Sequence, residues 1–68
     1  MNEKIATNIK NLRLEKHLSQ AQFGEQLSVS QDTVSLWEKG KSIPTTELII
    51  AICKQFEVSA DYLLGLED

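Results

Sequence analysis

The chain has 68 residues, 41% of them hydrophobic and 25% charged, with a formal net charge of −3. This composition is typical of a folded, soluble domain and is too apolar for a disordered segment. A chain this short builds only one small core, which argues against an enclosed active-site cavity, so we predict a single domain over residues 1–68.

The first predicted helix runs from about Glu3 to Lys16, with Asn2 as its N-cap. Its core-facing residues recur at helical spacing and are Ile5, Ile9 and Leu12. Lysine and glutamate residues are interspersed on the other face, as in a helix with one side in water.

Two capping motifs predict two further short helices. Ser19 and Gln22 form a capping box that begins one helix, and Ser30 caps the next. Hydrophobic staple pairs accompany both caps, namely Leu18 with Phe23 and Val29 with Val34. Because the second cap follows so soon after the first, only a tight turn fits between the two helices.

Glycine and proline mark the end of the third helix and the loop behind it. Gly40 is the expected helix stop, and Pro44 precedes a fourth helix over about residues 45–56. Ser59 then caps a short last helix, which Gly65 ends. No segment of useful length alternates with period two, so strands are not expected and we predict an all-α fold, a compact five-helix bundle.

The second and third predicted helices have the spacing of a helix-turn-helix, in which the second helix of the pair enters the DNA major groove. Gly24 falls where these two helices approach most closely. Glycine inside a helix costs about 1 kcal/mol relative to alanine, and a close contact accounts for its presence. Any short helical hairpin needs such packing, so the pattern alone leaves the function open.

The stretch from Leu18 to Pro44, LSQAQFGEQLSVSQDTVSLWEKGKSIP, resembles the helix-turn-helix of phage-repressor-like transcription regulators, the Cro/repressor or XRE family. The resemblance extends from about Ile5 to Gly65, and the closing VSADYLLG is similar to the last helix of that family. It implies a five-helix DNA-binding domain, usually dimeric on palindromic operators.

The resemblance also implies two sets of DNA contacts. Gln31 begins the third helix and is expected to read a base, and its chemistry agrees because glutamine pairs bidentately with adenine. The other expected base contacts share its outward face and are Asp32, Ser35 and Leu36. The expected phosphate contacts are Gln20, Lys39, Lys41 and Ser42. The alternatives are a solvated first-turn residue for Gln31 and a solvated loop for the lysines.

Two residues on that face depart from the family pattern. Leu36 occupies a position where arginine or lysine is common, and leucine can contact a thymine methyl group but cannot bond guanine. Asp32 either accepts from cytosine N4 or is there because an acid is favourable in the first turn of a helix, and we favour the second interpretation. Both departures predict modest affinity for each half-site.

An ion pair and strained turns are further implications of the resemblance. Arg13 and Glu38 match positions that pair in some family members, which would tie the first helix to the end of the third; two separate surface charges are the alternative. The family commonly has glycine where this chain has His17, Ser28 and Glu57. We therefore expect a positive φ at one or more of them, or a different turn.

The net charge taken alone discourages nucleic-acid binding, which requires cations. Its distribution weakens that objection, because residues 57–68 contain no Lys or Arg but four acids, which are Glu57, Asp61, Glu67 and Asp68. In residues 1–56, 7 basic side chains therefore accompany 6 of the 10 acidic ones. A basic face and an acidic end can coexist, since charges are screened over roughly 8 Å at physiological salt.

Metal, redox and catalytic sites are not expected. One cysteine, Cys53, and one histidine, His17, cannot form a disulfide framework or a three-ligand zinc site within one chain. No nucleophile–base constellation is recognisable, so neither a cofactor nor enzyme activity is expected. The longest apolar stretch is far below the roughly 20 residues of a membrane span and no secretory signal is recognisable, so the cytoplasm is the expected location.

We therefore predict a sequence-specific transcription regulator, a repressor that binds double-stranded DNA as a symmetric homodimer on two half-sites. Surplus apolar residues either mark the dimer interface or cover the edges of the core, and these are Leu48, Ile50, Leu64 and Leu66. No membrane partner and no small-molecule ligand are expected. The alternative, favoured by the net acidity, Asp32 and Leu36, is a protein-interaction module on the same fold, such as an antitoxin or an antirepressor target.

Overall fold

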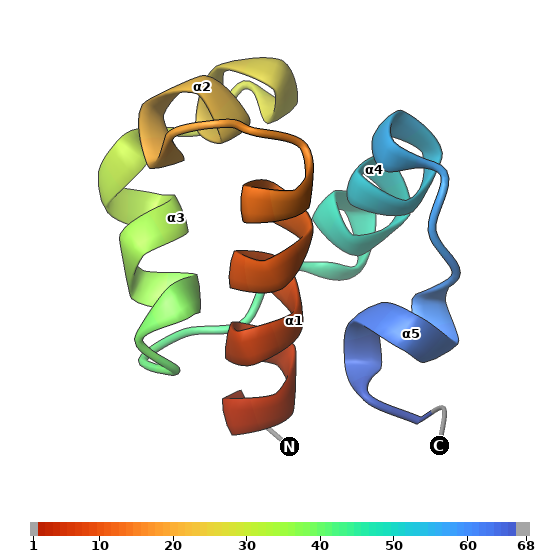
Figure 1. Cartoon of the computed structure of the whole chain (residues 1–68). Coiled ribbons are helices and arrows are strands. Elements are labelled where there is room, and N and C mark those ends of the chain that lie inside the picture. Colours follow the sequence, from red (N-terminus) through yellow and green to blue (C-terminus); the bar gives the residue numbers. More distant parts are fainter. Residues whose placement is uncertain (1, 67–68) are drawn as a thin grey trace.

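The computed structural model describes residues 2–66, which form five α-helices and no strand. In chain order these are α1 (Asn2–Glu15), α2 (Gln20–Leu27), α3 (Gln31–Glu38), α4 (Thr46–Phe56) and α5 (Ala60–Leu64). In Figure 1, α1 stands between α2 and α3 on one side and α4 and α5 on the other. The predicted all-α fold is confirmed for these residues, while Glu67 and Asp68 of the acidic end lie outside the described residues.

Hydroxyl side chains cap the short helices as the sequence pattern predicts. Ser19 Oγ accepts a hydrogen bond of 3.0 Å from the Gln22 backbone N–H, and Gln22 Oε1 accepts one of 2.9 Å from the Ser19 N–H, which completes the capping box. Ser30 and Ser59 cap α3 and α5 as predicted, whereas Thr45, predicted as the first residue of the fourth helix, is the N-cap of α4. Each such cap contributes about 1 kcal/mol, so the starts of these helices are fixed locally.

The ends of α1 differ by one residue from the prediction. Asn2 is the first residue of the helix rather than its N-cap, and the helix ends at Glu15, one residue before Lys16. The terminal N–H and C=O groups of a helix lack intrahelical partners, so helix ends vary by one or two residues. A side chain able to cap a helix therefore does not by itself fix where the first turn begins.

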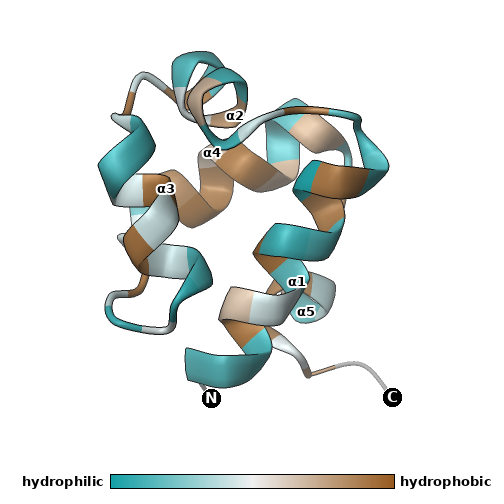
Figure 2. Cartoon of the chain, turned by 60° about the vertical axis from the view of Figure 1, so that its left-hand side comes forward, coloured by the Kyte–Doolittle hydropathy of each residue, from teal (hydrophilic) through white to brown (hydrophobic). Residues whose placement is uncertain are grey.

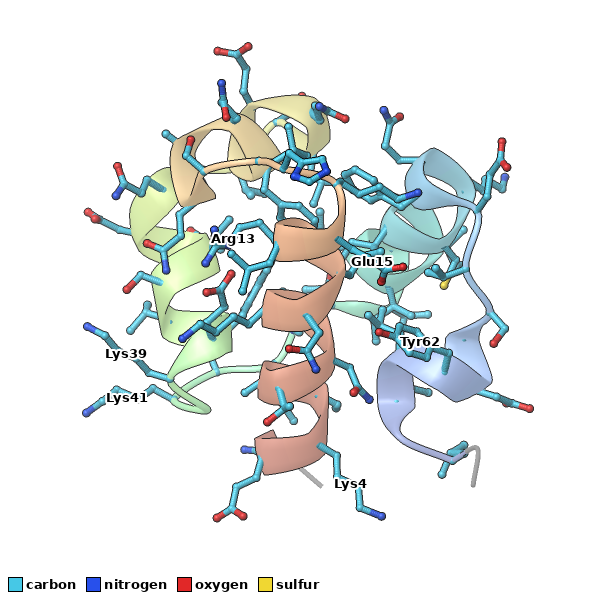
Figure 3. All side chains as sticks on the ribbon, viewed as in Figure 1. Lys4, Arg13, Glu15, Lys39, Lys41 and Tyr62 are labelled. Atoms are coloured by element: carbon cyan, nitrogen blue, oxygen red, sulfur yellow. The ribbon has the colours of Figure 1, made fainter. Side chains whose placement is uncertain are left out.

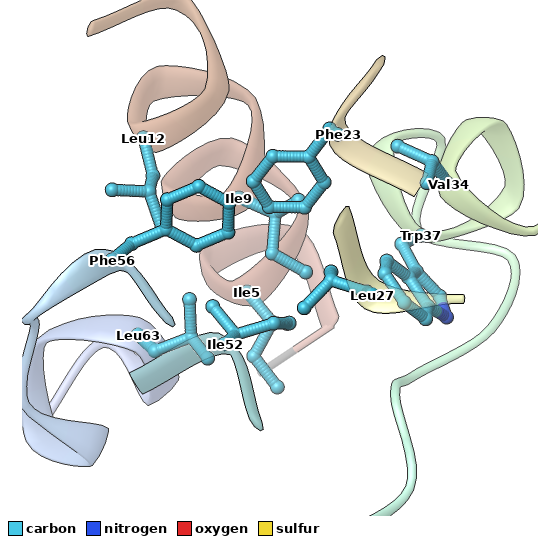
Figure 4. Close-up of a cluster of buried hydrophobic side chains, with 10 residues drawn as sticks. All are labelled: Ile5, Ile9, Leu12, Phe23, Leu27, Val34, Trp37, Ile52, Phe56 and Leu63. Carbon is cyan, nitrogen blue, oxygen red and sulfur yellow. The ribbon is translucent and has the colours of Figure 1, made fainter. Parts of the chain in front are cut away.

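One hydrophobic core joins all five helices (Figure 4), and its buried members are Ile5, Ile9, Leu12, Phe23, Leu27, Val34, Trp37, Ile52, Phe56 and Leu63. The rings of Phe23 in α2 and Phe56 in α4 stack with their centroids 4.8 Å apart. Such a pair adds about 0.5–1.5 kcal/mol beyond the area it buries. Hydrophilic and hydrophobic bands alternate along α1 and α3 (Figure 2), as expected for helices with one face packed inward.

The helices α2 and α3 meet at Gly24. A Cβ atom at this position would lie 2.6 Å from the carbonyl oxygen of Val29 and 3.2 Å from that of Ser30. Both neighbours are backbone atoms, which cannot move aside as the end of a flexible side chain can. The predicted close approach is therefore confirmed, and the missing side chain lets the turn between α2 and α3 lie directly against α2.

Three turns are closed by non-glycine residues in the left-handed region. His17, Ser28 and Glu57 have φ values of 59°, 60° and 57°, which confirms the expectation of positive φ. Ser28 and Glu57 are the C-caps of α2 and α4. A side chain in this region costs roughly 1–2 kcal/mol, so these turns hold strain that glycine would not.

Candidate nucleic-acid interface

The helix α3 lies at one edge of the molecule and packs against α1 and α2 (Figure 1). Val34 is fully buried and Trp37 is 2% exposed, so one face of α3 is anchored in the core. The four expected base contacts share the opposite face, where Ser35 is half-buried and the exposed members are Gln31, Asp32 and Leu36. The structure thus brings the four residues together on a largely solvent-exposed surface.

Two cations follow at the C-terminal end of α3. Lys39 and Lys41 are exposed and project outward near each other from the turn after the helix (Figure 3). Gly40 between them has a φ of 73°, and the Lys41 N–H donates to the Leu36 carbonyl at 3.0 Å, which closes the turn. Ser42 behind them is half-buried. The turn therefore places positive charge beside the exposed face of α3.

A bidentate ion pair joins Arg13 in α1 to Glu38 at the end of α3, so the pair that the resemblance implies is present. Arg13 Nε donates to Glu38 Oε2 at 2.7 Å and Arg13 Nη2 donates to Oε1 at 3.0 Å. Arg13 Nη1 also donates to the Leu18 carbonyl oxygen at 2.9 Å. The two side chains are only 11% and 4% exposed, and a pair this buried fixes orientation more than it adds stability.

The hydrogen bond to Glu38 raises the pKa of Arg13 above its ordinary value, against a smaller opposing effect of burial. A raised pKa in the folded state means that the stabilisation is complete below the unfolded-state pKa and is lost only as the pH rises through the folded-state value. The ordinary pKa of arginine is already far above neutrality. Arg13 therefore remains charged throughout the neutral pH range.

Gln20, an expected phosphate contact, is the first residue of α2 and is half-buried. Its Nε2 donates a hydrogen bond of 3.2 Å to Glu38 Oε1. The two residues are 18 positions apart, and their contact depends on how α2 crosses α3, so no spacing in the sequence reveals it. Gln20 thus has a partner within the protein, a contact that was not among the sequence-based expectations.

Thr33 is a polar residue of α3 that serves the start of the helix. Its hydroxyl oxygen lies 3.0 Å from that of Ser30, and its backbone N–H donates to Ser30 Oγ at 3.2 Å. The side chain is half-buried. Thr33 therefore belongs to the N-terminal cap of α3. The exposed face of the helix is formed by Gln31, Asp32 and Leu36.

Other kinds of site have little support in the described residues. Residues 2–66 contain no group of three or more His, Cys, Asp or Glu residues that could hold a metal ion. Two open hollows have volumes of about 340 and 400 Å³, and no residue of α3 lines either of them. Burial raises the pKa of the Cys53 thiol, which makes it less reactive. None of the helices in this part of the chain is long and apolar enough to cross a membrane.

The four surplus apolar residues divide into two pairs. Leu48 and Leu64 are half-buried and pack against the core, so they cover its edges. Ile50 and Leu66 are 50% and 61% exposed. Only the second pair is therefore free to contact another molecule.

Comparison with known proteins identifies a matching helix-turn-helix family and several relatives. A family model described as helix-turn-helix matches residues 9–63. The HTH-type transcriptional activator BcrR of Enterococcus faecalis is 43% identical over 67 residues, and the antitoxin PezA of Streptococcus pneumoniae is 39% identical over 61 residues. These alignments cover 98% and 90% of this chain but 31% and 39% of the relatives, so the chain spans about a third of their length.

A third relative is similar along nearly its whole length. The uncharacterized HTH-type transcriptional regulator YgzD of Bacillus subtilis is 35% identical over 64 residues, which cover 94% of this chain and 97% of the relative. No solved structure matches the chain significantly.

Proposed function

The chain belongs to the helix-turn-helix family of phage-repressor-like transcription regulators, and from that membership we propose that it binds double-stranded DNA sequence-specifically and regulates transcription. One observation carries the proposal. Val34 and Trp37 anchor one face of α3 in the core, while Gln31, Asp32 and Leu36 are exposed on the other. A helix held in this way offers its outer face to the major groove, which is wide enough to admit it.

In the proposed complex, one group of residues contacts the bases and a second group contacts the DNA backbone. Base edges are contacted by the outward face of α3, that is by Gln31, Asp32, Ser35 and Leu36. The DNA backbone is contacted by Lys39, Lys41 and Ser42 in the turn after α3, and by Gln20 at the N-terminus of α2. The lysines supply the cations that phosphate binding needs, and the helix N-terminus supplies N–H groups that favour an anion.

We propose a homodimer on a palindromic operator. An eight-residue helix such as α3 is about 12 Å long and spans roughly four base pairs at about 3.4 Å each. So short a contact cannot single out one site in a genome, whereas two copies related by a two-fold axis read two half-sites. Ile50 and Leu66 are the exposed apolar residues that we assign to the contact between the two copies.

The proposed outcome of binding is repression, because a dimer that occupies promoter DNA blocks polymerase without any further contact. BcrR is named as an activator, so the sign of regulation needs its own measurement. In vitro transcription from a promoter that carries a selected binding site should fall as the protein is added. A rise in transcript would make the protein an activator and leave DNA binding unaffected.

The test of the proposal is the salt dependence of binding to duplex DNA. Each neutralised phosphate contributes a log–log slope of roughly −0.9, so the two exposed lysines of one copy predict a slope of roughly −1.8 or steeper. Binding to a random duplex at low salt should show this slope, and a selected sequence should bind more tightly. Absence of any binding at low salt would contradict the proposal.

A second candidate function is a protein-interaction module, such as an antitoxin or an antirepressor target. The similarity to PezA, which is named as an antitoxin, favours it. So does the pairing of an acid with an exposed leucine on α3, because Asp32 opposes phosphate and Leu36 is suited to an apolar partner. A chain that shows no salt-dependent DNA binding but binds a protein partner through α3 would support this function instead.

A further inference from the structure

We infer that Leu36 packs against the C5-methyl group of a thymine, so that the α3 surface selects an A·T base pair at this position, beside the adenine that the family resemblance already implies for Gln31. This inference rests on the proposed function and specifies the bases that the same surface recognises. It depends on which chemical groups α3 exposes and which it lacks.

The outward face of α3 carries no cation, since the helix QDTVSLWE contains neither Lys nor Arg. Guanine presents two acceptors, N7 and O6, in the major groove, and its usual partner is the forked donor set of arginine or the ammonium group of lysine. The cations of this region, Lys39 and Lys41, follow the helix in the turn, where they are suited to the backbone. The helix itself therefore lacks the side chains that select guanine.

Among the exposed side chains of α3, Gln31 alone has an N–H donor. Thr33 is engaged with Ser30, and the indole of Trp37 is buried. A carboxamide places one donor group beside one acceptor, and this matches N7 and N6 of adenine. Asp32 offers acceptors only, so it repels N7 and O6 of guanine, and the one group of a G·C pair that it could bind in the major groove is the N4 donor of cytosine.

Leu36 is 43% exposed on a face that is otherwise polar. The one apolar group on any base edge in the major groove is the thymine C5-methyl, and burial against it removes apolar surface of both partners from water. Opposite any other edge, the leucine would desolvate a polar group without bonding it. Gln31 and Leu36 are five positions apart, a rise of about 7.5 Å, so the adenine and the thymine lie within about two base-pair steps.

The experiment begins with selection of bound duplexes from random DNA by the whole chain. In one selected duplex, each enriched thymine is then replaced singly by deoxyuridine, which removes the methyl group and keeps the base pair. One replacement in a half-site is expected to weaken binding about four-fold, the effect of burying one methyl-sized group. Leu36→Ala should abolish this difference between thymine and uracil.

Leu14→Ala is the matched control, because Leu14 is 52% exposed but belongs to α1. This variant should retain the full difference between thymine and uracil. Equal melting temperatures for the two variants and the parent chain would show that all three are folded.

Three results would overturn the inference. Selection of guanine opposite α3, indifference to every thymine replacement, or a thymine effect that persists in Leu36→Ala would each contradict the assigned chemistry while DNA binding itself stands. Failure to bind any duplex at low salt would instead remove the proposed function, and the inference with it.

Discussion

Gln20 Nε2 donates a hydrogen bond of 3.2 Å to Glu38 Oε1, which joins the first residue of α2 to the last residue of α3. The same carboxylate oxygen accepts from Arg13 Nη2 at 3.0 Å, and the guanidinium also donates to the Leu18 carbonyl. Glu38 is therefore the centre of a network that connects α1, the turn before α2, α2 and α3. Because these parts are joined, the proposed phosphate and base contacts keep a fixed relation to each other.

Removal of the Gln20 amide should weaken this network measurably. We expect Gln20→Ala to lower the free energy of unfolding by about 0.5–1.5 kcal/mol, the usual contribution of one hydrogen bond. Gln20→Glu should lower it further, since a second carboxylate would then face Glu38. Urea unfolding measures both changes. A Gln20→Ala variant as stable as the parent chain would show that the two side chains do not meet, because Gln20→Glu also gains about 0.3–1 kcal/mol from an acid in the first turn of α2.

Replacement of Gln31 should affect sequence preference rather than general affinity. We expect Gln31→Ala to relax the preference at one operator position by about 1–3 kcal/mol while binding to random DNA is retained. The measurement compares dissociation constants for a selected duplex, for single-base variants of it and for a random duplex. Gln26→Ala, a change of the same size on the exposed side of α2, is the control. An equal loss on every duplex would exclude base reading by Gln31.

Replacement of Lys41 should weaken general affinity for DNA rather than change sequence preference. Lys41→Ala removes a cation proposed to contact phosphate, so all sequences should bind more weakly and the salt slope should become shallower by about 0.9 for each bound copy of the chain. Lys54→Ala changes the net charge equally but lies in the last turn of α4, outside the proposed interface. The control variant should keep the parent slope. If the two variants change the slope alike, the effect is one of total charge and Lys41 is not a contact.

Local signals in the sequence were sufficient to predict the helices. The cap at Ser19 and the close approach at Gly24 both depend on residues within a few positions of each other, and each is found in the structure. The left-handed turn at Ser28, also found, was an implication of the family resemblance. Asn2 shows the limit of such signals, because a residue able to cap a helix can equally be its first member. Helix type was therefore predictable, whereas both ends of α1 differ from the prediction by one residue.

Contacts between helices required the folded structure. The bond from Gln20 to Glu38, and that of 2.9 Å from Gln55 in α4 to Gln26 in α2, link residues whose distance is set by helix crossing. The division of the surplus apolar residues also depends on rotation of helices about their axes, which left Ile50 exposed. The candidate DNA contacts came from a family resemblance, since a solvated face and a recognition face have the same periodicity.

Neutralisation of Asp32 should change both the stability of the protein and its affinity for DNA, and the two changes can be measured separately. Asp32 lies in the first turn of α3, where a negative charge stabilises the helix by about 0.3–1 kcal/mol. Asp32→Asn should therefore lower the stability by about this amount and, because a charge facing phosphate is removed, strengthen binding to random DNA at low salt. Glu25→Gln, the same charge change on the exposed side of α2, is the control. Weaker binding of random DNA by Asp32→Asn would contradict the view that the charge of this carboxylate opposes phosphate.

Relief of backbone strain at Ser28 should stabilise the protein without touching its contacts. Ser28 has φ 60° and ψ 37° as the C-cap of α2, and a side chain in this region costs roughly 1–2 kcal/mol. Glycine removes that cost but loses about 0.5–1 kcal/mol through the greater freedom of the unfolded chain, so Ser28→Gly should gain up to about 1.5 kcal/mol. Ser28→Ala, which keeps the strain, should gain nothing. Thermal unfolding distinguishes the two variants, and an equal response of both would mean that the backbone strain at Ser28 contributes little to stability.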